Sequence, residues 1–274
     1  MKKYSILSLV LIFLFSCKKD TQDGMPAYIH IDDITLNTNV DEGAATEKII
    51  DAWVYINKNL QGIYELPAHF PVLKQGQQDI SIYGGIRVNG IATSRARYPF
   101  YESYNITELL QQASTTVITP SISYFEWSSF FIEDFQGVGT NIDSTSSSEI
   151  NFSIISDSTG EKYAEAILND PFLTFEVATD KFENLPKAGS PVFLELDYTC
   201  NTEILVGVYV KESAVPIPLV WVTPKENWNK IYINLTPTVS EFYDASSFKF
   251  FISMRRPDSL EQAKVQFDNL KIVY

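Results

Sequence analysis

The sequence of 274 residues is poor in the side chains that carry most enzyme chemistry. It contains only two histidines, His30 and His69, and two cysteines, Cys17 and Cys200. A zinc site of the usual kind needs several histidine or cysteine ligands close together, and a serine–histidine–aspartate triad needs a histidine near a Gly-x-Ser-x-Gly turn. Neither histidine lies near such a turn, and no Gly-x-x-x-x-Gly-Lys-Ser/Thr loop occurs. The sequence therefore supplies neither a usual zinc site nor such a triad, and a nucleotide-binding P-loop is excluded.

Basic residues are also in short supply. Lysine and arginine together number 21, against 34 aspartates and glutamates, which gives a formal charge of -13. Nucleic-acid binding depends on neutralising phosphates with basic side chains, so we expect no nucleic-acid partner. Hydrolysis of a glycan needs only two carboxyl groups at a fixed separation. The abundance of acidic residues therefore leaves a glycan hydrolase open as an alternative.

What the sequence does contain favours strands. Aromatic residues make up 14% of the chain and apolar residues 45%, enough for a packed core. Residues 28–36 and 49–57 alternate between apolar and polar side chains, the period of a half-buried strand. We predict an all-β protein, with a small N-terminal module similar to a β-sandwich and a C-terminal jelly-roll β-sandwich.

The first 17 residues have the features of a signal peptide: a basic start, a short apolar stretch and a small residue before Cys17. Leu14, Ser16 and Cys17 resemble a bacterial lipobox, which implies cleavage before Cys17 and attachment of lipid, including acyl chains such as palmitate. Residues 18–26 then form a tether. Lys18 in place of an aspartate suggests the outer membrane, and the tether resembles those of Bacteroidetes-type surface lipoproteins. The periplasmic and cell-surface faces both stay open.

Residues 27–120 are predicted to be the N-terminal β module. Predicted strands at 49–57, 63–67, 70–73 and 79–83 are separated by turns. The layout of residues 50–86 resembles the small β modules of the PEGA kind, and this resemblance implies an interaction or spacer role. Residues 107–112 could form a single helical turn.

Residues 121–274 are predicted to be the jelly-roll domain, because nine short strands follow one another between turn residues. The following segments resemble the superfold of carbohydrate-binding modules and galactose-binding-like domains: 133–135, 192–198, 228–235 and 265–272. The resemblance covers residues 128–274. It implies that the first and last strands of the domain are neighbours, and that the domain binds a glycan or another protein.

Several residues are candidates for binding. Trp221 and Trp127 could stack on sugar rings, whereas Trp228 begins a predicted core strand and is expected to be structural. Arg95, Arg97 and Tyr101 could form a contact patch, or belong to strands that pack their aromatic side chains inward. Cys200 lies in an apolar run and is expected to be a small buried side chain.

Calcium is the expected ion, if there is one, because hard cations prefer carboxylate and carbonyl oxygens. Glu133, Asp134 and Asp268 would lie on neighbouring strands in the jelly roll, where the superfold often holds a structural calcium. The alternative is that these carboxylates simply face solvent.

These observations predict a protein that is not an enzyme. We expect an outer-membrane lipoprotein, anchored through Cys17, that binds a glycan or an envelope protein. One alternative is an accessory subunit of an outer-membrane assembly that docks through the region of Arg95, Arg97 and Tyr101. The other is the glycan hydrolase.

Overall fold

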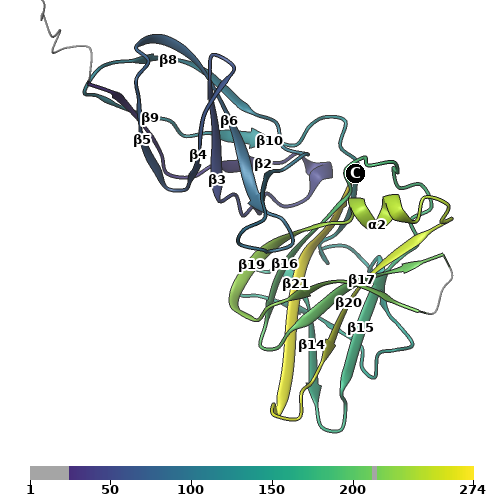
Figure 1. The fold of residues 1–274 in the computed structure, drawn as a ribbon. Helices are drawn as coiled ribbons and strands as arrows, with labels where there is room; N and C mark the ends of the chain where they lie inside the picture. Colours follow the sequence, from purple (N-terminus) through teal and green to yellow (C-terminus); the bar gives the residue numbers. More distant parts are fainter. Residues whose placement is uncertain (1–24, 212–214) are drawn as a thin grey trace, which may run out of the picture.

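The computed structural model describes residues 25–211 and 215–274, and it consists of two β domains joined end to end (Figure 1). The predicted all-β fold class is confirmed. Cys17 and most of the predicted tether lie outside the described residues. Within the described part of the chain, no helix combines the length and apolar character needed to cross a bilayer.

The N-terminal domain is built from three small sheets, with strand orders β5-β1-β9, β10-β2 and β4-β3-β6-β7, and β8 pairs with β6. Its elements are β1 (Ala27–Ile31), β2 (Thr35–Asn37), η2 (Val40–Glu42), β3 (Asp51–Ile56), β4 (Asn59–Glu65), β5 (Ala68–Val72), β6 (Gly76–Arg87), β7 (Arg95–Arg97), β8 (Tyr104–Leu110), β9 (Thr115–Val117) and β10 (Ser121–Ser123). Alternate side chains of β1, β3, β5 and β6 enter one shared core. The domain is therefore similar to a sandwich, as period-two patterning predicts.

Two expectations for this domain need correction. Residues 107–112 do not form a helical turn, because most of them belong to β8, which pairs with β6 in register Thr107↔Asp79. The residues directly after the predicted boundary at 120 also belong to this domain. Strand β10 pairs with β2, and Tyr124 is buried in the N-terminal core. The chain therefore leaves the N-terminal domain after Tyr124.

The C-terminal domain is a sandwich of two antiparallel sheets, with orders β13-β14-β21-β16-β19 and β12-β15-β20-β17-β18. Its elements are β11 (Phe130–Glu133), β12 (Ile142–Ser144), β13 (Ser153–Ser156), β14 (Lys162–Asn169), β15 (Thr174–Thr179), β16 (Phe193–Cys200), β17 (Ile204–Val210), β18 (Ile217–Val222), β19 (Lys225–Asn234), α2 (Thr236–Glu241), β20 (Phe248–Arg255) and β21 (Gln262–Val273). From β14 onward nearly every connection crosses between the sheets, as in a jelly roll. The first strand, β11, pairs with the last, β21, as expected. Cys200 is buried in the core, also as expected.

The larger sheet of this sandwich has an outer face that is used in two ways. Alternate side chains of β16, such as Leu194 and Leu196, enter the sandwich core, so Glu195 and Asp197 point outward. Toward one end of the sheet the N-terminal domain covers the outer face. There Phe193, Tyr232 and Val273 are part of the N-terminal core. Toward the other end the face stays open.

The covered part holds a buried charge, the carboxylate of Glu195, whose side chain is 0% exposed. It accepts hydrogen bonds from the hydroxyls of Tyr98 (2.7 Å) and Tyr124 (2.9 Å), both from the N-terminal domain. Lys230 of β19 lies 3.0 Å from its second oxygen. Burial alone would raise the pKa of Glu195, but Lys230 and Lys271 more than offset this and lower it. Glu195 therefore stays ionised, and both domains contribute to keeping it so.

Further polar contacts surround this ion pair. The hydroxyl of Tyr232 shares a hydrogen bond of 3.0 Å with that of Tyr101 and accepts one from the backbone N–H of Lys48. The Lys271 ammonium donates to the carbonyl of Ala44 at 2.8 Å. Tyr101 is thus buried between the domains. Its assignment to an exposed contact patch is wrong, because its ring and its hydroxyl both make contacts in the interior of the protein.

We expect Glu195→Gln to lower the free energy of unfolding by about 3–5 kcal/mol, because the substitution leaves the buried Lys230 ammonium without its main counter-ion. Urea unfolding at neutral pH measures this. Glu65→Gln is the matched control. Glu65 is 59% exposed and pairs with Arg95 at 3.2 Å, so its loss should cost less than about 1 kcal/mol. Equal effects of the two substitutions would contradict the role assigned to Glu195.

Candidate functional site

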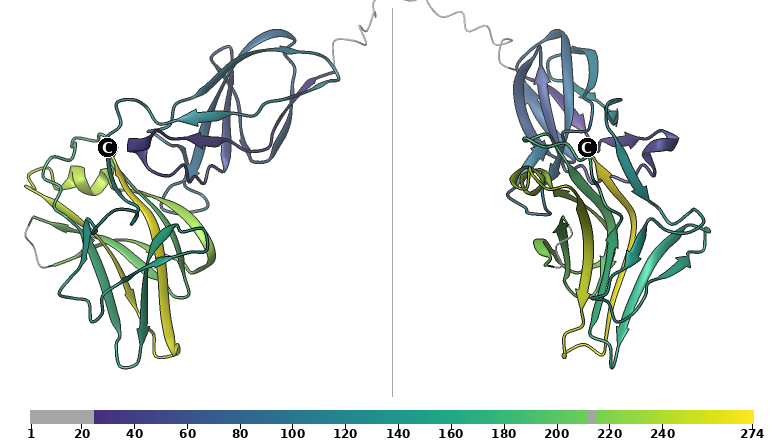
Figure 2. Two further views of the ribbon diagram at one scale, coloured as in Figure 1. Left: turned by 180° about the vertical axis from the view of Figure 1, so that it is seen from behind. Right: turned by 90° about the vertical axis from the view of Figure 1, so that its right-hand side faces the viewer.

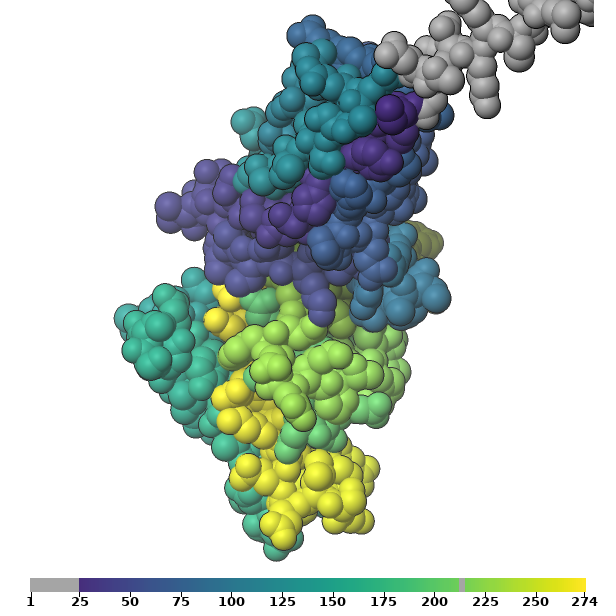
Figure 3. Space-filling view, turned by 90° about the vertical axis from the view of Figure 1, so that its left-hand side faces the viewer, coloured from purple at the N-terminus to yellow at the C-terminus, as the bar shows by residue number. Residues whose placement is uncertain are grey.

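The open part of the outer sheet face carries the candidate site. Its side chains come from four adjacent strands, β14, β21, β16 and β19, and they are partly exposed or lie at the edge of the covered part. We call this surface the open face; it comprises Tyr163, Glu165, Asp197, Trp228, Gln266 and Asp268. Figure 3 views the molecule from this side, where β21 (yellow) is seen between the teal segment that includes β13 and β14 and the yellow-green β19.

Two aromatic rings form the apolar part of the open face. Trp228 is 49% exposed, and Tyr163 contacts it edge-on with 5.4 Å between ring centroids. Trp228 belongs to the first half of β19, where Lys225 to Trp228 are all exposed. The ring of Trp228 is therefore held by a neighbour while much of its surface remains accessible.

Polar groups surround these rings. The amide of Gln266 donates to the hydroxyl of Tyr163 (3.2 Å) and to the carboxylate of Glu165 (2.7 Å). The ammonium of Lys264 lies 2.7 Å from the same carboxylate. These contacts fix the directions of the hydroxyl, amide and carboxylate groups beside the indole. Such a surface can make an apolar contact and directed hydrogen bonds at the same time.

A backbone irregularity brings two carboxylates together at the border between the covered and open parts. The pairing of β16 with β21 shifts register between Glu195 and Asp197, and Asn269 takes a left-handed φ of 48° there. Its amide donates to Asp197 at 3.0 Å and also contacts Asp268. Burial is the main cause that raises the pKa of Asp268 to about 7. The hydrogen bond from the Asn269 backbone lowers this pKa, and the charges of Asp197, Asp134 and Glu161 raise it.

Two shallow clefts lie on this face. One, of about 300 Å³, runs from Trp228 past Asp197 and Asp268 to Thr46 and Glu47 of the N-terminal domain. The other, of about 320 Å³, lies around Thr199, Lys264 and Gln266. The groups that could contact a ligand are thus spread along the sheet instead of converging in one deep pocket. This shape suits an extended ligand.

The three carboxylates predicted to hold calcium lie in different surroundings. Glu133 is buried, and its two oxygens accept hydrogen bonds from the backbone N–H groups of Phe135 and Asn141. Asp134 lies close enough to Asp268 to affect its pKa. In residues 25–211 and 215–274, no three or more histidine, cysteine, aspartate or glutamate side chains are grouped to hold a metal ion. Calcium binding stays a prediction.

The predicted binding residues are dispersed. Trp127, 58% exposed, lies in the segment that joins the domains and stacks on Phe125, with 5.3 Å between centroids. Arg95 pairs with the buried Asp51 at 2.6 Å, and the guanidinium of Arg97 lies 4.7 Å from the centroid of Tyr83. Trp221 is 62% exposed and lines a different cleft, at the junction of the domains.

Trp228, the aromatic centre of the open face, was expected to be structural. Its ring is nevertheless 49% exposed, because the buried part of β19 begins only after it, at Lys230. One signal in the sequence could have identified it. Successive side chains of a strand point to opposite faces of the sheet, so Trp228 lies on the same face as Lys230, two residues later. The apolar Ile231 and Ile233 lie on the opposite face, toward the core, which places Trp228 on the outer face.

The sequence matches no protein-family model and no curated protein. Among solved structures, the chain is similar to a family 29 carbohydrate-binding module from Piromyces equi, at 10% identity over 54% of this chain and 91% of the module, with a TM-score of 0.36. It is also similar to the family 11 carbohydrate-binding module of a Clostridium thermocellum cellulosomal cellulase, at 16% identity over 53% of this chain and 94% of the module, with a TM-score of 0.35. This is a likeness of fold alone.

The raised pKa of Asp268 makes a prediction for stability. An unfolded chain releases the proton of this carboxyl near the ordinary pKa of 3.8, whereas the folded protein keeps it until about pH 7. Between these values the folded state binds more protons, so the stabilising contribution of Asp268 is complete below pH 3.8 and is lost as the pH rises through 7. Urea unfolding at several pH values should therefore show that the free energy of unfolding of Asp268→Asn increases relative to that of the wild type as the pH rises. Parallel curves would contradict the assigned pKa.

Proposed function

We propose that the protein binds a glycan on the open face without changing it chemically. One observation carries this proposal: the half-exposed indole of Trp228 is held edge-on by Tyr163 beside fixed amide, hydroxyl and carboxylate groups. Sugar rings present apolar faces that stack on aromatic rings, and hydroxyl groups that need directed hydrogen bonds. The open face offers both in one place.

The shape of the surface supports a glycan chain as the ligand. The clefts on either side of Trp228 lie along the sheet and are shallow, and they continue from the N-terminal domain toward Gln262. A chain of sugars could lie across them with one ring on the indole.

Glycan hydrolysis is the alternative, favoured by the raised pKa of Asp268 beside Asp197, since a hydrolase needs one protonated and one ionised carboxyl group.

We also propose that the protein is an outer-membrane lipoprotein anchored through Cys17. The support is the sequence around Leu14, Ser16 and Cys17. The first described residues lie at the end of the N-terminal domain that is remote from the C-terminal domain (Figures 1 and 2). An anchor attached there would hold the open face away from the membrane, with the N-terminal domain as a spacer.

The role of Trp228 can be tested on a glycan array with the soluble fragment 25–274. We expect Trp228→Ala to reduce binding to the recognised glycan at least tenfold, because the loss of one stacking surface removes more than about 1.4 kcal/mol. Trp127→Ala is the matched control, since it removes an indole of similar exposure that lies away from the open face. It should bind like the wild type.

Two results would count against glycan binding at this site. One is binding that survives Trp228→Ala and is lost with Trp127→Ala. The other is a wild-type fragment that binds no glycan at all. Release of shorter sugars from a bound glycan, abolished by Asp268→Asn, would instead support the hydrolase.

The lipid anchor predicts a simple fractionation result. In bacteria that express the full chain, Cys17→Ser should abolish labelling by radioactive palmitate and move the protein from the membrane to the soluble fraction, because acyl chains supply the binding to the bilayer. Cys200→Ser is the control and should change neither property, since Cys200 is buried in the sandwich. Unchanged labelling of Cys17→Ser would rule out the anchor.

A further inference from the structure

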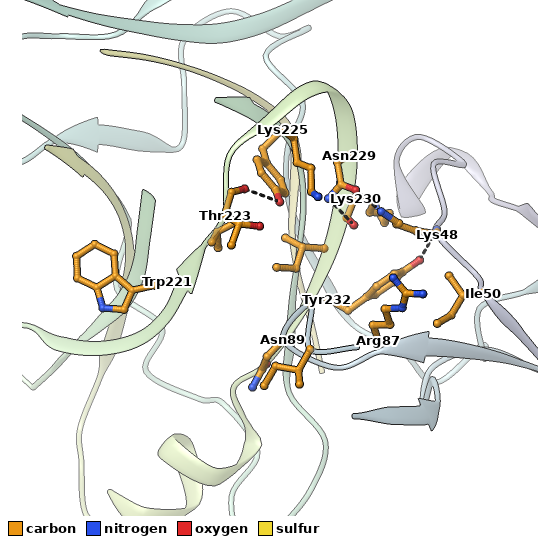
Figure 4. Close-up of a pocket in the computed structure, with 15 residues that line it drawn as sticks. Lys48, Ile50, Arg87, Asn89, Trp221, Thr223, Lys225, Asn229, Lys230 and Tyr232 are labelled. Atoms are coloured by element: carbon orange, nitrogen blue, oxygen red, sulfur yellow. Dashed lines mark hydrogen bonds between the residues drawn. The ribbon is translucent and has the colours of Figure 1, made fainter. Parts of the chain in front are cut away.

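A third cleft, of about 240 Å³, lies at the junction of the two domains, and its surroundings differ from those of the open face. One wall comes from the N-terminal domain, with Lys48, Arg87 and Ile91. The other comes from the hairpin of β18 and β19, with Trp221 and Lys225. Figure 4 shows Lys48 and Arg87 at one side, Lys225 on the hairpin above and Trp221 at the opposite side. We call it the junction cleft.

The lining of the junction cleft is basic in a strongly acidic protein. The chain has 34 acidic and 21 basic residues, yet no aspartate or glutamate is among the described residues that line the cleft, and four basic residues are: Lys48, Arg87, Lys225 and Lys230. Lys230 is neutralised by Glu195 below the surface. The three others face the cleft without such a buried partner.

The contacts of these three cations do not fully neutralise their positive charges. In the described parts of the chain, Lys225 forms no ion pair and its ammonium no hydrogen bond, and the Nε atom of Arg87 is buried without an acceptor. Arg87 reaches Glu65 only at 3.5 Å, and Lys48 contacts the neutral side chain of Asn229. Burial lowers the pKa of Lys48, and the charges of Lys225 and Arg87 lower it further. The three cations thus repel one another, and an anion between them would relieve this repulsion.

The cleft also has an apolar wall. Trp221 is 62% exposed, and Ile91 is 52% exposed on the side of the N-terminal domain. The cleft volume is below the range of roughly 300–1,000 Å³ that is usual for larger ligands. These features fit one ring with an attached anion better than a long chain.

We propose that the junction cleft binds a single acidic sugar residue, whose carboxylate lies among Lys48, Arg87 and Lys225 and whose ring contacts Trp221. This is a binding site in addition to the open face. Its ligand class differs, because charge is required, and it needs both domains in their observed arrangement. An arginine can bind a carboxylate through two parallel hydrogen bonds, and the lysines add charge from either side.

Calorimetric titration of fragment 25–274 with tri-galacturonate at low ionic strength tests this proposal. We expect tri-galacturonate to bind, and we expect Lys225→Gln to weaken this binding at least tenfold. Added salt should also weaken the binding. Lys58→Gln removes the same charge from the distant hairpin between β3 and β4, and it should leave the affinity unchanged. Trp221→Ala should weaken binding and Trp228→Ala should not, which separates this site from the open face.

The fully methyl-esterified trimer and inorganic sulfate complete the test. The ester should bind at least tenfold more weakly, because it lacks the charge, and sulfate should compete only poorly, because it lacks the ring. The proposal is overturned if tri-galacturonate does not bind, if the ester binds equally well, or if sulfate alone binds as tightly. It is also overturned if Trp228→Ala, and not Lys225→Gln, abolishes binding. Trp221→Ala should leave recognition of a neutral glycan intact, because Trp221 lines the junction cleft and neither cleft of the open face, so failure of one site is distinguishable from failure of the other.

Discussion

The ionised carboxylate of Glu195, buried between the domains, is the interaction on which the rest of the structure depends. Removing a charge from water is costly unless partners replace the lost hydration. Here two tyrosine hydroxyls from the N-terminal domain and one ammonium from the C-terminal domain replace it. Because the partners come from both domains, separating the domains would leave Glu195 without two of its donors. The domains are therefore expected to behave as one body.

This constraint determines where ligands can bind. The N-terminal domain occupies one end of the outer sheet face, so the open face is limited to the other end, and Thr46 and Glu47 border one of its clefts. The same placement brings Lys48 and Arg87 opposite Lys225 in the junction cleft. The cleft bordered by Thr46 and Glu47 and the junction cleft both require residues from the two domains. The N-terminal domain is thus more than a spacer, because it contributes walls to both regions.

The sequence predicted well what depends on local pattern. The alternation of apolar and polar side chains along β1, β3 and β16 predicted strands there, and the all-β class followed from this pattern. It could not reveal features that depend on packing between distant segments. The strand predicted at 79–83 continues as β6 through Gly84 and Gly85. A glycine is needed at position 85 because a Cβ atom there would lie 2.8 Å from the indole nitrogen of Trp53. Burial of Tyr101 against Tyr232, 131 positions later, is equally invisible to a local pattern.

The most direct test of this account is the relative orientation of the two domains in solution. Residual dipolar couplings of fragment 25–274 report the alignment of each domain separately. If the Glu195 network holds the domains as one body, the couplings from both should fit a single alignment tensor with the domains oriented as in Figure 1. Two tensors of different magnitude would show independent motion and would contradict the account.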